Sequence, residues 1–464
     1  MMGIKLNLHS ALHKSVSNAP LVVFRIIFGV LMFTSMIRFA AKGWIHDLYV
    51  APEFLFAYRG FEWLPRPDGF WIYILFVVTA AAALGIALGS FYRWSATLFF
   101  LGFTYIELLD KANYLNHYYF VSLMAFILIW LPAHRSFSLD VKWQRIAPNH
   151  ITPAWTILAP QFLLGIVYFF AGVAKLNAEW LLNANPLRIW LPQHADLPLI
   201  GSLLTHTWVA YVLSWCGALY DLSIVFLLWN RRTRPYAYVA VIVFHVFTAT
   251  LFPIGMFPLI MMACTLVFFS PQFHERILEL LGHKAKGNHE VHSSQSRFPR
   301  LVTTGFIIFF AVQLLLPLRS HLLSDNVYWT EEGYRFSWRV MLMEKAGKTF
   351  FYVSDKNYPG EQEIHPGCHL TLNQEKMMST QPDMMLQYAH HLRKQWKQQG
   401  LENPSIRAEA WVSLNGKGSR LLLDPRVDLG STHYSMGNNP WILPFDSVVT
   451  SAHLAQMRLK TWAK

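Results

Sequence analysis

The chain has 464 residues, of which 54% are hydrophobic, 16% aromatic and only 14% charged. Soluble globular proteins average about 25% charged residues, so this composition excludes a disordered chain and argues against a purely soluble enzyme. The net charge of +12 is compatible with binding to nucleic acid, with binding to anionic lipid, or with basic loops held on one side of a membrane.

Long apolar runs occupy the first two thirds of the chain. A helix needs about 20 largely apolar residues to cross the hydrocarbon core of a bilayer. We therefore predict a polytopic α-helical membrane domain at residues 1–323, with about nine spans. The candidate runs, several of them short or interrupted by polar residues, are 20–41, 70–91, 95–110, 117–133, 154–174, 207–229, 236–252, 255–270 and 301–318.

The basic residues of the short loops predict how these spans are oriented. If residues 1–19 are cytoplasmic and the spans alternate, the inside loops hold 14 Lys and Arg residues and the outside loops hold six. Such an excess is typical of cytoplasmic loops. We expect a cytoplasmic N-terminus, a polar inside loop at 276–300, and a C-terminal region outside the cytoplasm. Orientation explains the charge more economically than nucleic acid, for which we find no motif.

Residues 324–464 lack long apolar runs and form the predicted second domain. Short segments at 348–354, 407–414 and 419–423 are partly aromatic or β-branched, which indicates strands. The segment 383–399 has apolar residues at spacings of three and four, which indicates an amphipathic helix. We therefore expect an extracytoplasmic α+β domain after the membrane domain.

The start of that amphipathic helix also has a sequence signature. Thr380 and Asp383 resemble a capping box, in which the two side chains bond to each other's backbone N–H groups. Pro382 between them suits the first turn of a helix, because its missing N–H group is not needed there. The sequence thus predicts that the helix begins at a capping box formed by Thr380 and Asp383.

One lysine lies at the end of a predicted span. Lys175 follows the run 154–174 at its outer face, and ionisable groups in spans are costly and frequently functional. One interpretation is that the stem stays in the apolar layer while the ammonium group reaches water. The other is a buried amine, because burial disfavours the charged form and leaves a neutral amine available as a base.

Asn116 and His117 lie next to each other in an outside turn, where they would form a donor and acceptor pair at the membrane boundary. The alternative is ordinary loop polarity with interfacial tyrosines. In the predicted topology both residues share the outer face with Lys175 and the second domain, and this convergence favours a functional site.

Two more polar residues lie within apolar runs. His245 is either a hydrogen-bonded core histidine or part of a site, and Asp221 either pairs with a neighbouring helix or serves the site. No histidine pair has convincing metal-ligand spacing, so no metal is predicted.

Several short segments together carry a family resemblance. In the membrane part they are Val23-Phe24-Arg25, Leu109-Asp110-Lys111 with Asn116-His117, Val167 to Val173 with Lys175-Leu176, and Ile254 to Phe257. In the second part they are Tyr334 with Ser337-Trp338, Trp411-Val412-Ser413 and Asp424 to Asp428. In this order they resemble the vitamin K-dependent gamma-glutamyl carboxylases, whose membrane part is a horizontally transferred transmembrane domain.

The resemblance implies a reaction. Vitamin K hydroquinone is deprotonated and reacts with dioxygen, and the strongly basic vitamin K species that results removes a γ-proton from a peptide glutamate. Carbon dioxide then adds to the carbanion to give γ-carboxyglutamate, and the vitamin leaves as its epoxide. The implied partners are a peptide or protein substrate, the lipid bilayer and a quinone reductase that regenerates the hydroquinone.

The resemblance also implies roles for individual residues. Lys175 matches the lysine that activates the hydroquinone, while Asp110, Asn116 and His117 match the motif near the quinone head. His245 is expected to line the same pocket. The family's glutamate-binding segment matches four residues just outside the last predicted span, namely Trp329, Tyr334, Ser337 and Trp338.

The chain departs from the family pattern in two places. Met343 stands where the family has a histidine after the Ser-Trp motif, and animal members continue far beyond the Asp424 to Asp428 segment. We expect propeptide binding and processivity to be absent or different, as in a short bacterial or other non-animal homologue, which would lie in the inner membrane if bacterial. Two alternatives stay open: a vitamin K epoxidase with weak or no peptide carboxylation, and a non-catalytic quinone-binding or transport protein.

Overall fold

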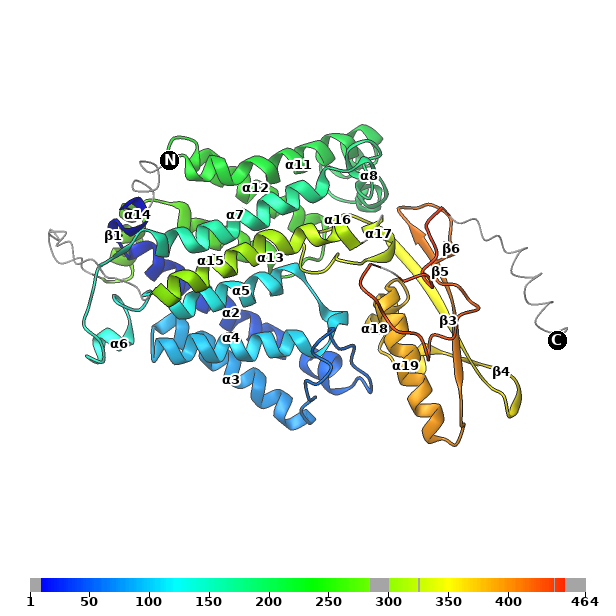
Figure 1. The fold of residues 1–464 in the computed structure, drawn as a ribbon. Helices are drawn as coiled ribbons and strands as arrows, with labels where there is room; N and C mark the ends of the chain where they lie inside the picture. Colours follow the sequence, from blue (N-terminus) through cyan, green and yellow to red (C-terminus); the bar gives the residue numbers. More distant parts are fainter. Residues whose placement is uncertain (1–9, 284–299, 324–325, 438, 447–464) are drawn as a thin grey trace.

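The structure is a computed structural model that describes residues 10–283, 300–323, 326–437 and 439–446. An elongated body of helices is followed by a smaller domain built on a β-sheet (Figure 1). The sheet domain lies at one end of the helical body, next to α8 (Ala178–Leu181) and α17 (Val327–Thr330). At the opposite end lie β1 (Ser15–Ser17), α6 (Leu139–Lys142) and α14 (Pro271–Leu280). Most of the predicted loop 276–300 is outside the described residues.

Each predicted apolar run coincides with a helix or a pair of short helices. Six helices are long and apolar enough to cross a membrane, or seven if one bent pair counts as a span. The helices that coincide with the nine predicted runs, whether or not they pass this test, are α2 (Ala19–Ala41), α3 (Gly69–Leu88), α4 (Tyr92–Leu109), α5 (Asn116–Trp130), α7 (Trp155–Lys175), α11 (Thr207–Trp229), α12 (Arg234–Leu251), α13 (Phe257–Thr265) and α15 (Arg300–Leu315).

The predicted number of about nine spans is therefore not confirmed. Helix α5 has 15 residues, about 22 Å at 1.5 Å per residue, which is short of the roughly 30 Å hydrocarbon core. Helix α4 contains Arg93 and Glu107, which lower its hydropathy. The segments Phe257–Phe268 and Pro271–Leu280 meet at a bend of 117°.

The shorter elements connect these helices. Strand β1 pairs antiparallel with β2 (Ile151–Pro153). The short helical elements are η1 (His46–Val50), η2 (Lys111–Asn113), α9 (Leu187–Trp190), η3 (Leu191–His194), α10 (Gly201–Leu204), η4 (Leu266–Phe268), η5 (Leu316–Arg319), α16 (Ser320–Leu323) and η6 (Pro366–Cys368).

Arg25, which belongs to the first family-like segment, has a structural role. It is fully buried and donates hydrogen bonds to the carbonyls of Ile86 and Ala87 at the end of α3, and to that of Phe137. The last carbonyls of a helix have no partner within the helix, so the guanidinium caps α3. Gly89 ends α3 in the left-handed region at a φ of 63°, and a side chain there would collide with Arg25.

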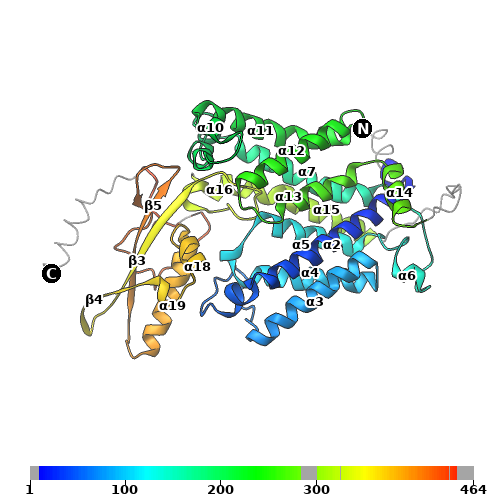
Figure 2. The same ribbon diagram turned by 180° about the vertical axis from the view of Figure 1, so that it is seen from behind.

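The sheet domain contains four antiparallel strands in the order β4-β3-β5-β6. They are β3 (Lys345–Asp355), β4 (Tyr358–Ile364), β5 (Ser405–Leu414) and β6 (Arg420–Leu421). Alternate residues of β5, such as Ile406, Ala408 and Val412, are buried, and they pack in one core with Met385 and Leu392. These last two belong to α19 (Pro382–Gln398), which with α18 (Leu372–Met378) covers the sheet (Figure 2).

The predicted strands coincide with β3, β5 and β6, and the predicted amphipathic helix with α19. The predicted capping box is wrong. The N-cap of α19 is Gln381 and makes no side-chain cap, although Pro382 does occupy the first turn. Asp383 instead pairs with Lys111 and Arg335, because two cations attract the carboxylate more strongly than a backbone N–H group does.

The two parts of the chain share a core. Phe56, from the segment between η1 and α3, and Ala112, from η2, belong to the same buried cluster as the apolar residues of β5 and α19. Trp329 joins this cluster from α17. The sheet domain therefore rests on the helical body through apolar contacts, and this contact places the segment 328–345 between the two parts.

Candidate active site

Lys175 is the last residue of α7, and its side chain is buried. The Nζ atom donates to Asp221 Oδ2 of α11 at 2.6 Å and to the carbonyl of Ala171 at 3.4 Å. The two charged residues are only 6% and 5% exposed. Of the two interpretations of Lys175, the structure thus excludes a side chain that reaches water and places a buried ion pair there.

Glycine allows the two helices to approach closely beside this pair. A Cβ atom at Gly172 would lie 2.9 Å from the backbone nitrogen of Leu222, a separation that real Cβ atoms do not adopt. At Gly217 on α11, by contrast, an added Cβ would lie 3.9 Å from the Lys175 Cε, which is an ordinary van der Waals contact. Because Gly172 lies one turn before Lys175, the close approach of the helices that it allows brings the amine next to Asp221.

His245 and His117 contact the same aromatic ring. Each imidazole centroid is 5.6 Å from that of Phe257, at the start of α13. His245 Nε2 also lies 3.1 Å from the hydroxyl of Tyr168, which is on α7 two turns before Lys175. The structure thus brings His117 and His245, which the resemblance assigns to one pocket, to the same ring. Within the described residues, no hydrogen bond joins either histidine to Lys175.

Asn116 holds the predicted peptide-binding segment. Its Nδ2 donates to the carbonyl of Arg339 at 2.8 Å, and its Oδ1 accepts from the hydroxyl of Tyr114 at 2.9 Å. The same hydroxyl accepts from the backbone N–H of Phe336 at 2.7 Å. Both polar atoms of the amide are therefore used to fasten the loop 334–339.

Asp110 lies at the contact between the two parts of the chain. Its carboxylate accepts hydrogen bonds from the backbone N–H groups of Phe56 and Ala112 and from Gln374 Nε2 of α18. Burial raises the pKa of the Asp110 carboxyl to about 6, although these hydrogen bonds and the charge of Lys111 act in the opposite direction. These contacts point to docking of the sheet domain rather than to contact with a quinone.

Lys111, beside Asp110, completes the docking contact. Its Nζ donates to Asp383 Oδ2 at 2.7 Å, and Arg335 Nη1 donates to the same oxygen at 2.9 Å. Burial would raise the pKa of the Asp383 carboxyl, but the charges of Arg335 and Lys111 outweigh it and hold that pKa well below the usual value.

The four predicted glutamate-binding residues belong to a tightly folded segment. Trp329 is buried and donates to the carbonyl of Leu443, while Trp338 is buried and stacks on Tyr119 with ring centroids 5.0 Å apart. Ser337 donates to the carbonyl of Gly333. The ring centroid of Tyr334 lies 6.5 Å from that of Tyr328.

The backbone of this segment is unusual. Phe336, Trp338 and Met341 all have φ between 52° and 61°, in the left-handed region that bulky side chains avoid. Residues held in such conformations cluster at functional sites, because the surrounding structure must over-determine them.

Sequence reasoning missed two residues here, Tyr328 and Arg339. The hydroxyl of Tyr328 donates to the carbonyl of Ala174, next to Lys175, and accepts from Arg339 Nη1, both at 3.1 Å. Arg339 is 6% exposed. The only signal in the sequence was a charged residue directly after Ser337-Trp338.

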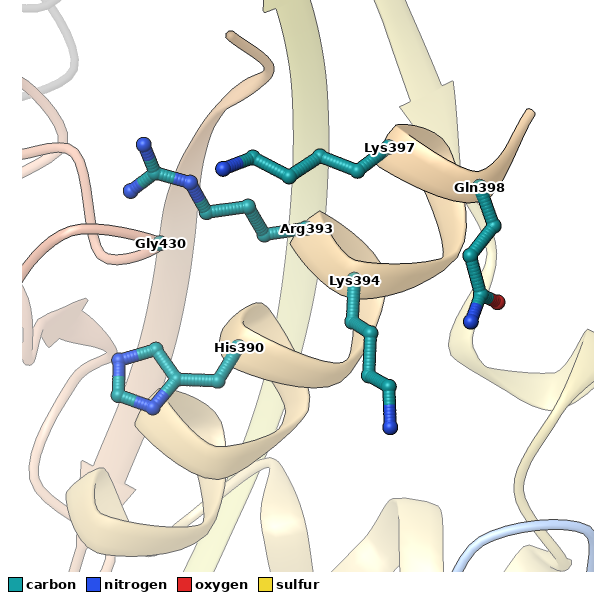
Figure 3. A pocket seen from close by; sticks show the side chains of 6 residues that line it. All are labelled: His390, Arg393, Lys394, Lys397, Gln398 and Gly430. Carbon is teal, nitrogen blue, oxygen red and sulfur yellow. The ribbon is translucent and has the colours of Figure 1, made fainter. Parts of the chain in front are cut away.

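A separate cavity of about 410 Å³ lies on the surface of α19 and contains none of the predicted site residues. Figure 3 shows Arg393 and Lys397 extending from α19 towards the loop that carries Gly430. Four of the six residues that line this cavity are basic or histidine, and the lining consists of His390, Arg393, Lys394, Lys397, Gln398 and Gly430. Within the described residues, no group of three or more His, Cys, Asp and Glu side chains is arranged to hold a metal ion.

The apolar helices and the appended sheet domain define a multi-pass membrane protein with one domain outside the bilayer. Comparison with family models gives two adjacent matches, to the HTTM domain over residues 13–273 and to the lumenal domain of vitamin K-dependent gamma-carboxylase over residues 298–448. No solved structure matches the chain. The chain belongs to the vitamin K-dependent gamma-glutamyl carboxylase family, which confirms the resemblance of its short segments.

Proposed function

We propose that this protein is an integral-membrane gamma-glutamyl carboxylase that couples oxygenation of vitamin K hydroquinone to carboxylation of peptide glutamate. The observation that carries the proposal is the buried pair of Lys175 and Asp221, with 2.6 Å between Nζ and Oδ2, at the family's base position. Overall, the hydroquinone, dioxygen, carbon dioxide and glutamate give the epoxide, γ-carboxyglutamate and water. The hydroquinone supplies, on oxygenation, the strong base that glutamate requires.

Asp221 gives Lys175 a way to act as a base. An ammonium group cannot accept a proton, so the amine must first release one. Asp221 Oδ2 is within hydrogen-bond distance, and transfer of the proton to it leaves a neutral amine beside a neutral carboxylic acid. The transfer buries no unpaired charge, which is why an apolar site tolerates it. The neutral amine then deprotonates the hydroquinone.

We place the quinone head beside Phe257, between His117 and His245. The aromatic side chains there suit a naphthoquinone ring, and the imidazoles can donate hydrogen bonds to an oxyanion. Tyr168 fixes the orientation of His245 through its hydroxyl. In the family the matching asparagine donates a hydrogen bond to the quinone. To do so here, the Asn116 amide would have to give up its hydrogen bond to the carbonyl of Arg339. Each turnover consumes a hydroquinone, so a quinone reductase is needed as a partner.

We further propose that residues 1–323 form the catalytic membrane domain and that residues 324–464 form the extracytoplasmic domain that binds peptide. This assignment is supported by the fold, because β1 and the sheet domain lie at opposite ends of the helical body (Figure 1). The loop count of basic residues assigns the β1 end to the cytoplasm. In this orientation the segment 329–338 presents glutamate from outside to the membrane-borne quinone.

The proposal is tested with purified protein, vitamin K hydroquinone, oxygen, labelled bicarbonate and a glutamate peptide. We expect both epoxide and labelled peptide. Epoxide without label would identify a vitamin K epoxidase, an outcome that Met343 in place of the family's histidine would explain. Neither product from folded protein, shown by a cooperative thermal transition, would contradict the proposal and favour a quinone-binding or transport protein.

A further inference from the structure

Arg339 is a buried cation without a counter-ion in the part of the chain that the structure describes. Its Nη1 and Nη2 donate to two neutral hydroxyls, those of Tyr328 at 3.1 Å and Ser320 at 3.0 Å. The buried Nε atom has no hydrogen-bond partner. Among the described residues, no carboxylate lies within the 4.0 Å that defines an ion pair with Arg339, although the residue is only 6% exposed.

The other buried lysine and arginine residues of the described chain are compensated. Lys111 pairs with Asp383, and Lys175 pairs with Asp221. Arg25 donates to three backbone carbonyls at the end of α3. The guanidinium of Arg339 has two hydroxyls as hydrogen-bond partners, and its Cζ lies 5.5 Å from the centroid of the Tyr328 ring. These neutral groups replace only part of its lost hydration, which is unfavourable for a buried charge. Of these four buried cations, Arg339 is therefore the one that a bound anion would stabilise most.

The position of Arg339 connects the two candidate sites. Its carbonyl accepts from Asn116, and the Tyr328 hydroxyl that it contacts donates to the carbonyl of Ala174, directly before Lys175. Asn177, two residues after Lys175, donates to the same hydroxyl at 3.1 Å. Arg339 therefore contacts Asn116, at the start of α5, through its backbone carbonyl and the end of α7 through its guanidinium and Tyr328.

The backbone around Arg339 holds the guanidinium in place. The residues on either side, Phe336, Trp338 and Met341, adopt left-handed conformations. Gly333 packs so closely that an added Cβ would lie 2.8 Å from the Cα of Ser320, the residue whose hydroxyl Arg339 binds. Such a strained and closely packed loop keeps the charge at a place where no carboxylate of the described residues pairs with it.

We propose that Arg339 binds the side-chain carboxylate of the substrate glutamate, an inference that rests on the proposed function. A guanidinium has five N–H donors in a planar fork that matches a carboxylate, and only two of the five make the hydrogen bonds described above. Removal of the γ-proton transfers negative charge onto the carboxylate oxygens. A guanidinium bound to those oxygens stabilises that charge as it develops.

The test compares binding of a glutamate peptide with binding of the same peptide carrying glutamine. We expect wild-type protein to bind the glutamate peptide at least tenfold more tightly, Arg339→Gln to lose this preference, and Arg339→Lys to keep part of it. An unchanged preference in Arg339→Gln, an equal loss for both peptides, or no preference in the wild type would overturn the proposal.

Two controls separate this result from other causes. Lys394→Gln, in the basic cavity of Figure 3, should leave the preference unchanged; a loss there instead would move the site to α19 and overturn the proposal. Arg339→Met should have a thermal midpoint no lower than the wild type without peptide, because it removes an unpaired charge. A large decrease would show a structural arginine and also contradict the proposal.

Binding is measured without hydroquinone, so failure of the two proposals can be distinguished. Wild-type protein that discriminates between the peptides through Arg339 but forms neither epoxide nor carboxylated peptide would refute the enzymatic proposal alone. Protein that carboxylates the peptide while Arg339→Gln keeps its preference for glutamate would refute the role of Arg339 alone.

Discussion

Lys175 Nζ and Asp221 Oδ2 lie 2.6 Å apart and join α7 to α11, and the two residues are only 6% and 5% exposed. The pair is both a structural link and the proposed proton relay. Removing one partner leaves an isolated buried charge, whereas removing both leaves apolar surfaces that pack.

Asp221→Asn should therefore reduce stability more than the double variant Lys175→Met/Asp221→Leu. We expect the single variant to lose about 3–5 kcal/mol and the double variant to recover most of this loss. Both should form at least a hundredfold less epoxide, because neither has the relay. Thermal midpoints and epoxide formation check the two parts separately. A double variant as unstable as the single one would show that the residues do not act as a pair.

The glycine beside this pair should be indispensable. Gly172→Ala places a Cβ atom 2.9 Å from the Leu222 backbone nitrogen, so α7 and α11 must separate and the Lys175–Asp221 distance must increase. We expect a lower thermal midpoint and a loss of epoxide formation. Gly305→Ala on α15 is the matched control, because no atom lies within 4 Å of its added Cβ. Equal behaviour of the two variants would contradict this account.

Two variants distinguish whether Asn116 fastens the loop 334–339 or acts on the quinone. If its main function is to fasten the loop 334–339, Asn116→Ala and Tyr114→Phe should both raise KM for the glutamate peptide several-fold, with a smaller effect on epoxide formation. If its amide acts on the quinone, only Asn116→Ala should lower epoxide formation. Steady-state kinetics of both products distinguish these outcomes.

The raised pKa of Asp110 predicts a pH dependence of stability. A carboxyl that binds its proton more tightly in the folded state stabilises the fold at low pH, and this contribution is lost as pH rises from about 4 to about 6. The change is up to about 3 kcal/mol, since one pKa unit is worth about 1.4 kcal/mol. Asp110→Asn should flatten the profile of thermal midpoint against pH in this window.

Asp383→Asn is the matched control for this profile. The pKa of Asp383 is held below 3.8, so its stabilising contribution is present above that pH and is lost only at more acidic values. The variant should be less stable throughout but keep the slope between pH 4 and 6. Equal slopes in wild type and Asp110→Asn would show that the Asp110 carboxyl does not titrate in this window.

The helices could be predicted because burial in lipid or in a core imposes long apolar runs, and each run coincides with a helix. The number of spans could not, since a run of 15 residues such as α5 is apolar whether or not it crosses the bilayer. Strand β4 also escaped prediction. Its residues Gly360 to Glu363 are exposed, so they lack the alternation that identifies a half-buried strand.

The candidate site was predictable only where a local motif marks it. Lys175, His117 and His245 stand out as polar groups in apolar runs, whereas the partners of Asp383 depend on long-range folding. Lys111 is 272 residues away from Asp383 in the chain, and no local pattern reports such a contact. Arg339 is recognised only from what surrounds it, because the absence of a counter-ion among the described residues can be seen only in three dimensions.

The most direct test of the central claim is epoxide formation by Lys175→Met, measured with vitamin K hydroquinone and oxygen beside the wild type. Loss of a single amine that acts as the base should abolish epoxide and labelled peptide together, while binding of the glutamate peptide persists. Undiminished epoxide formation in folded Lys175→Met would remove Lys175 from the role of base and contradict the account.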